Sequence, residues 1–152
     1  MKQKIGIGAI INCISAVIAI VALILFGIGW GGSGGLFAAQ YDSMGPAVAV
    51  TIIGVVLVIL SIVLNILKKD NLILGFLAGC MSVVACIMFG LLFFFVLRCS
   101  VYEMGISWAS DLHNGEPYVS QACSKALVAA ILAVVAVIVN GIGSMFPTTK
   151  EA

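Results

Sequence analysis

Charged residues are scarce in this chain of 152 residues, where seven are Lys or Arg and six are Asp or Glu. They make up 9% of the sequence, whereas an ordinary soluble domain carries about 25%. Hydrophobic residues make up 63%, and a soluble protein of this length buries only about 70% of its chain surface. The composition therefore predicts a membrane protein. The net charge of +1 also argues against binding of nucleic acid, which requires a basic patch.

Motifs for metal binding and catalysis are missing as well. The five cysteines include no CxxC pair, and the single histidine, His113, lies in a polar stretch, so neither a metal site nor a cofactor is expected. No HExxH motif is present, and we expect no enzymatic activity. A membrane enzyme remains as a weaker alternative, and it would require a pocket that gathers Glu103, Asp111 and His113.

Four apolar runs dominate the sequence, and none contains a charged residue or a histidine. Each reaches the roughly 20 residues that cross a hydrocarbon core about 30 Å thick, and none alternates as β-barrel strands do. The first run is too long for a signal peptide. We therefore predict an all-α, four-helix up-and-down membrane bundle, a single domain over residues 1–152. Its helices cover about 5–30, 46–67, 72–97 and 126–146.

The positions of Lys and Arg predict the orientation of these helices. Five lysines flank helix ends on one side of the bundle, and only Arg98 and Lys125 flank them on the other. Because Lys and Arg concentrate on the cytoplasmic side, both termini are predicted to be cytoplasmic. Segments 31–45 and 98–125 then form outer loops, 68–71 a tight inner turn, and 147–152 a cytoplasmic tail. The five lysines are Lys2, Lys4, Lys68, Lys69 and Lys150.

Two cysteines bracket the second outer loop. Cys99 follows the third helix and Cys123 precedes the fourth, so an antiparallel helix pair brings them close enough for a disulfide, on the side where disulfides persist. A metal site made with His113 is the alternative, and the wide spacing disfavours it. Between the cysteines, alternating apolar residues predict an extended ribbon, and a short helix over 107–112 is the rival.

Aromatic residues of the outer loops are candidates for contact with a partner or with the membrane interface, where Trp and Tyr are enriched. The candidates are Trp30, Phe37, Tyr41, Tyr102, Trp108 and Tyr118.

Polar residues inside the predicted helices gather in the half toward the termini. Three asparagines each have a serine one turn away, which places each pair on one helix face. Such groups act as hydrogen-bonded clamps between membrane helices, or they line a polar vestibule or small-ligand site. The cluster consists of Asn12, Ser15, Ser61, Asn65, Asn140 and Ser144.

Small residues on the third helix favour close helix packing. Gly75 and Gly79 form a GxxxG motif that Ser82 continues, and such residues let helix backbones approach closely in a bilayer. The packing partner is either a helix of this chain or a helix of another copy.

The predicted plan resembles that of tetraspanins: four helices, both ends inside, a minimal inner turn and a cysteine-bearing second outer loop. The tetraspanin Cys-Cys-Gly motif is absent and the loop is shorter, so the resemblance concerns topology alone. The chain also looks like small four-helix proteins common in bacteria, which implies the bacterial cytoplasmic membrane.

The absence of charge within the helices argues against ion-coupled transport. We expect an accessory or scaffold subunit whose partners are the bilayer and either other membrane proteins or further copies. The alternative is a homo-oligomeric channel or small-solute export pore with Thr51, Ser61 and Asn65 facing a shared axis.

Overall fold

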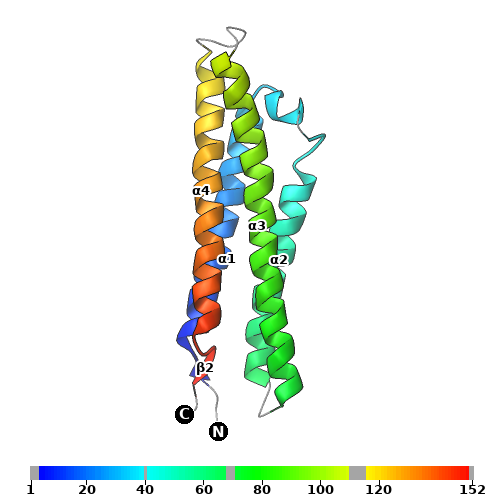
Figure 1. Ribbon diagram of the computed structural model, residues 1–152, viewed down its shortest axis with the longest axis vertical. Coiled ribbons are helices and arrows are strands. Elements are labelled where there is room, and N and C mark those ends of the chain that lie inside the picture. The colour runs from blue at the N-terminus through cyan, green and yellow to red at the C-terminus, as the bar shows by residue number, and fades with distance from the viewer. Residues whose placement is uncertain (1–3, 40, 68–70, 110–115, 151–152) are drawn as a thin grey trace.

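The computed structural model describes residues 4–39, 41–67, 71–109 and 116–150. Its main elements are α1 (Ile7–Gly32), α2 (Gly45–Leu67), α3 (Leu72–Ala109) and α4 (Pro117–Met145), with a short 3-10 helix, η1 (Leu36–Ala39), between α1 and α2 (Figure 1). All four α-helices are long and apolar enough to cross a membrane. The predicted all-helical membrane fold is therefore confirmed, and the four helices suggest an integral membrane protein.

The helices are arranged as two closely packed pairs. α1 runs along α4, α2 runs along α3, and contacts between α3 and α4 join the pairs. Alanines fill the interface of the first pair, where Ala19 and Ala133 are among those completely buried, because small side chains let membrane helices approach closely. In the second pair, Gly54 of α2 admits the ring of Phe89, whose Cε1 lies 2.6 Å from where a Cβ at position 54 would be.

Large aliphatic side chains cover the outside of the bundle. Ile24, Ile59, Ile87 and Ile131 are more than half exposed, one on each helix. Water would oppose this exposure, but lipid chains are as apolar as these side chains. The distribution fits a bundle surrounded by lipid.

α3 continues well beyond its predicted end at residue 97. Residues 98–109 are helical, so the predicted ribbon is wrong for this segment, and the rival short helix is replaced by an extension of α3. The buried residues Val96, Cys99, Ser100 and Glu103 recur at helical spacing, and no proline lies between residues 72 and 116. The alternation had suggested a strand because the exposed Tyr102 was counted with its apolar neighbours.

α4 begins at Pro117, nine residues before the predicted start at 126. Proline suits the first helical turn because its missing N–H needs no partner there. Most of the predicted second outer loop is therefore helix, and its tip at 110–115 lies outside the described residues.

The two chain ends meet at one end of the bundle. β1 (Lys4–Ile5) pairs antiparallel with β2 (Thr149–Lys150), with Lys4 opposite Lys150, and the N–H of Gly6 donates to the carbonyl oxygen of Thr148 at 2.8 Å. A side chain at Gly6 would collide with Pro147 O. Part of the predicted tail 147–152 is thus folded back onto the start of α1.

Candidate functional site

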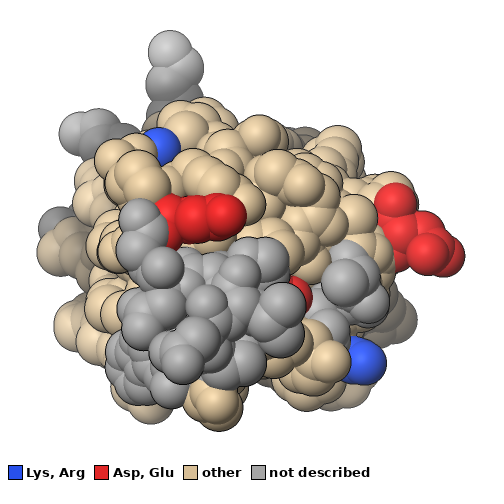
Figure 2. All heavy atoms as spheres, turned by 90° about the horizontal axis from the view of Figure 1, so that it is seen from above, with Lys and Arg blue, Asp and Glu red and all other residues tan. Residues whose placement is uncertain are grey.

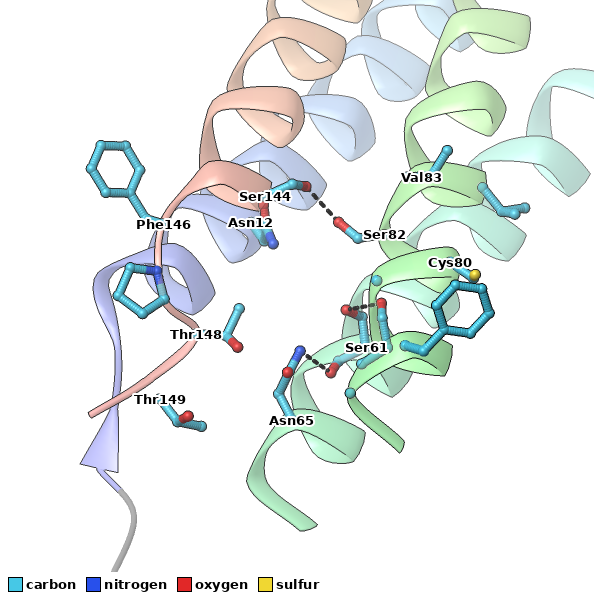
Figure 3. A pocket seen from close by; sticks show the side chains of 16 residues that line it. Asn12, Ser61, Asn65, Cys80, Ser82, Val83, Ser144, Phe146, Thr148 and Thr149 are labelled. Atoms are coloured by element: carbon cyan, nitrogen blue, oxygen red, sulfur yellow. Dashed lines mark hydrogen bonds between the residues drawn. The ribbon is translucent and has the colours of Figure 1, made fainter. Parts of the chain in front are cut away.

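A cavity of about 770 Å³ opens between the two helix pairs, at the end where the chain termini meet (Figure 3). All four helices contribute to its wall, and so does the segment that follows α4. Its volume falls within the roughly 300–1,000 Å³ of small-molecule sites. This cavity is the candidate site.

A hydrogen-bonded clamp joins α3 to α4 beside the cavity. Ser144 Oγ donates to Asn140 O at 2.8 Å on its own helix, so Ser82 must be the donor in the 2.6 Å bond between Ser82 Oγ and Ser144 Oγ. Asn140 Nδ2 donates to Ser82 O at 3.3 Å. The three side chains therefore hold the two helix pairs together, and Figure 3 shows the bond between the serines.

A second clamp joins α2 to α3. Ser61 Oγ donates to Ala78 O across the interface at 2.8 Å. Asn65 Nδ2 donates to Ser61 O one turn back along α2 at 3.0 Å. The side chain of Asn65 lines the cavity, and its Oδ1 has no hydrogen bond recorded within the described residues.

Asn12 is the least satisfied polar side chain of the site. Its side chain lines the cavity although the residue is only 2% exposed, and it has no hydrogen-bond partner among the described residues. Oδ1 is completely buried and packs against Gly143 of α4. Asn140 Oδ1 is likewise buried and unpaired there. Leaving a buried polar group unpaired lowers the stability of the fold by about 1–3 kcal/mol. Among the described residues, these two amide oxygens are the buried side-chain polar atoms that carry this cost.

The structure brings together most, but not all, of the predicted polar cluster. Asn12, Ser61, Asn65 and Ser144 line the cavity, whereas Ser15 and Asn140 are buried outside its lining. Ser15 Oγ donates to Asn12 O within α1 at 2.7 Å.

The sequence reasoning missed one wall of the cavity. Phe146, Pro147, Thr148 and Thr149 line it, and helical periodicity says nothing about where a tail folds. The glycines at positions 6 and 8 were the available signal, since a pair of small residues at the start of a helix allows another chain segment to approach.

The predicted packing residues of α3 behave differently from one another. Ser82 is buried and bonded to α4. Gly75 and Gly79 line the cavity instead, and no atom lies within 4 Å of where a Cβ of Gly79 would be. Among the described residues, Gly79 thus packs against no other helix.

The end of the bundle opposite the chain termini holds two buried thiols and a buried carboxyl group. Cys99 and Cys123 lie in the same apolar core cluster and carry no disulfide in this structure, so the predicted bond is not shown. The carboxyl group of Glu103 acts electrostatically on both thiols. Glu103 lies in the predicted second outer loop, but it is only 3% exposed because α3 continues through this segment and turns it inward. Asp111 and His113 lie outside the described residues.

Two of the aromatic residues predicted to contact a partner, Phe37 and Tyr41, make contacts within the chain instead. Phe37 is completely buried and stacks on Phe26 at 6.2 Å between ring centroids, with half-buried Trp30 at the same separation. Tyr41 lies 5.2 Å from Phe95, and the guanidinium of Arg98 lies 5.1 Å from the centre of the tyrosine ring. These contacts hold the segment between α1 and α2 against α1 and α3.

The remaining candidates lie on the extended helices. Tyr102 on α3 is 50% exposed and Tyr118 on α4 is 42% exposed. Trp108 belongs to the last turn of α3. Figure 2 looks onto this end of the molecule and shows a described surface that is mostly uncharged, with separate acidic and basic groups.

One catalytic pattern was overlooked in the sequence. The letters GGSGG at 31–35 fit the GxSxG of serine hydrolases, but Ser33 is buried at the end of α1 and its Oγ donates to Trp30 O. That motif requires a strand before the serine, and here a helix precedes it.

Within the described residues, no group of three or more His, Cys, Asp or Glu side chains is placed to hold a metal ion. No protein-family model, curated protein or solved structure matches this chain.

Proposed function

We propose that this chain is a non-enzymatic accessory subunit that binds another membrane protein through the outer hairpin, meaning residues 98–109 of α3 together with the first turns of α4. The observation that carries this proposal is the length of α3. Its 38 residues span about 57 Å at 1.5 Å per residue, against a hydrocarbon core of about 30 Å. About half of α3 therefore exceeds what the membrane requires.

The surface of the outer hairpin suits a protein partner. Val101, Tyr102 and Tyr118 are exposed there, and tyrosine is enriched at protein interfaces. A helical hairpin is already ordered before binding, so association costs less conformational entropy than the ordering of a flexible loop. Lateral contacts of the lipid-facing helices add to this interface.

The proposal includes an orientation. The excess of lysine near the chain ends and the inner turn favours cytoplasmic termini, which places the outer hairpin on the extracytoplasmic side of a bacterial cytoplasmic membrane. Disulfides persist on that side, and we include a bond between Cys99 and Cys123 in the proposal.

Purification in a mild detergent tests this function. We expect a second membrane protein to co-purify at a defined stoichiometry and to be lost from the variant carrying both Tyr102→Ala and Tyr118→Ala. A matched control carries Ile87→Ala and Ile131→Ala, which remove similarly exposed side chains from the lipid-facing surface of the same two helices and should reduce co-purification much less than the tyrosine changes.

Two outcomes contradict the accessory role. A monomer without any partner would leave the outer hairpin with no function, and a homo-oligomeric ring that conducts solute would favour the pore. We favour the accessory subunit because Thr51 and Ser61 are buried and donate to backbone carbonyl oxygens within the chain, those of Ala47 and Ala78. Neither side chain faces outward toward an axis shared with other copies.

A further inference from the structure

The cavity at the terminal end combines unused hydrogen-bonding groups with an apolar wall. Asn12 Nδ2 makes no hydrogen bond with the described residues, and Asn65 Nδ2, which donates to Ser61 O, lies on the opposite side of the cavity. The side chains of Thr148 and Thr149 complete this rim from the segment after α4, and no hydrogen bond of theirs is recorded there. These amide N–H and hydroxyl groups are donors that suit the oxygens of a phosphate ester.

The local charge also favours an anion. The described residues that line the cavity include no acidic side chain. The sequence places five lysines and two acidic residues, Asp70 and Glu151, before α1, between α2 and α3, and after α4. Of these residues the structure describes Lys4 and Lys150, which lie opposite each other in the β1–β2 pair at this end, and such cationic side chains attract anionic headgroups, as basic pockets between membrane helices do.

The opposite wall of the cavity reaches the lipid-facing surface. Phe76 and Val83 of α3 line the cavity and remain 75% and 59% exposed. The lining of α3 runs from Gly75 to Val84, which is about 14 Å along the helix. A molecule in this cavity can thus keep a polar group near the water boundary and lay an apolar chain against α3.

We propose that the cavity binds one anionic phospholipid from the leaflet at the terminal end, with its phosphate on the side chains of Asn12, Asn65, Thr148 and Thr149 and an acyl chain along Phe76 and Val83. A helix of another protein is disfavoured as the occupant, because its apolar side chains would leave the N–H groups of Asn12 Nδ2 without an acceptor. The site lies at the opposite end of the molecule from the outer hairpin, so it stands independently of the proposed function.

Native mass spectrometry of the full chain in mixed micelles tests the proposal, with equal amounts of dioleoyl phosphatidylglycerol and dioleoyl phosphatidylcholine. We expect one phosphatidylglycerol to be retained per chain. Gly79→Leu fills the cavity and should weaken retention by about tenfold or more, the factor that corresponds to loss of a few hydrogen bonds and contacts. Thr148→Val with Thr149→Val should weaken it by about fivefold.

Gly90→Leu is the matched control. It lies on the same helix, has equally open space around its Cβ position, and does not line the cavity, so it should retain the lipid. Equal retention of phosphatidylglycerol by the Gly79 and Gly90 variants would overturn the site.

Two further outcomes concern the ligand. Equal retention of phosphatidylcholine would overturn the preference of the site for an anionic lipid, and displacement of phosphatidylglycerol by soluble glycerol phosphate would show that a free anion is the ligand. Loss of a dimer in the Gly79 variant, with lipid retention unchanged, would show that a second copy occupies the cavity.

Discussion

Single polar residues decide how the two helix pairs are held together. The carbonyl oxygen of Ser82 accepts a hydrogen bond from Asn140 Nδ2. The hydroxyl of Ser82 donates a 2.6 Å hydrogen bond to Ser144 Oγ. In a bilayer, where lipid tails are as apolar as leucine, such bonds and close packing replace the hydrophobic drive between helices. The asparagine and serine spacing in the sequence correctly placed Asn140 and Ser144 on one face of α4, but it could not identify Ser82 as their partner.

A double-mutant cycle measures this contact. We expect Ser82→Ala and Ser144→Ala to show a coupling of about 0.6 kcal/mol in the free energy of unfolding, and at most about 1.7 kcal/mol, as for other side-chain bonds between membrane helices. Unfolding in mixed detergent and SDS micelles provides the measurement. The control cycle pairs Ser82→Ala with Ser124→Ala, because exposed Ser124 donates to Ser120 O within α4. Coupling as small as in the control would contradict the clamp.

At the scale of elements, α3 is the structure that the sequence predicted least completely. Its first part follows from an uninterrupted apolar run, whereas residues 98–109 are mixed in polarity and could be read as a ribbon. The decision depends on whether another element covers these side chains: Cys99, Ser100 and Glu103 are buried, and Cys99 shares the apolar core cluster with Cys123 of α4. A helix that begins at Pro117 is available to cover them only because α4 also extends beyond its apolar run.

The cysteines of the outer hairpin allow a test of the proposed disulfide. Because both thiols are buried, alkylation of the folded protein would not distinguish a bond from burial. Under denaturing conditions without reductant, we expect Cys13, Cys80 and Cys86 to react, and Cys99 and Cys123 to react only after reduction. Peptide mass spectrometry identifies the modified residues.

A bond that closes this loop should raise the free energy of unfolding by about 3 kcal/mol. Cys99→Ser should remove both the stabilisation and the effect of reductant, whereas Cys13→Ser, at an exposed position of α1, should change neither. Reaction of all five thiols before reduction would rule the disulfide out.

At the scale of the whole molecule, the two chain ends close the bundle at one end and leave a cavity between the helix pairs. The pairing of β1 with β2 ties the start of α1 to the end of α4, so both termini lie at the same end (Figure 1). Within the part of the chain that the structure describes, no hydrogen bond ties the α2 and α3 pair to β1 or β2, and the cavity lies between this pair and the joined termini (Figure 3).

Reporter fusions test the orientation of the whole molecule. A fluorescent protein that folds only in the cytoplasm should be fluorescent when fused to either terminus, because the lysine distribution places both ends inside. Alkaline phosphatase, which needs an oxidising compartment, should be active when inserted between residues 110 and 115. Fluorescence at only one terminus would contradict a four-helix topology, and phosphatase activity at the termini would reverse the orientation.

The sequence alone determined the class of this protein and the number of its membrane helices, because the lipid environment demands long apolar segments whose length can be read directly. It also determined that polar side chains such as Asn12, Asn65 and Ser144 belong to one half of the bundle, since helical rise converts position into depth. Only the tertiary structure decided that the chain after Met145 returns to Gly6 and Gly8, that Gly79 faces an opening, and that Glu103 is buried. Those outcomes depend on which surfaces meet between segments far apart in sequence, and the periodicity of a single segment carries no information about its partner.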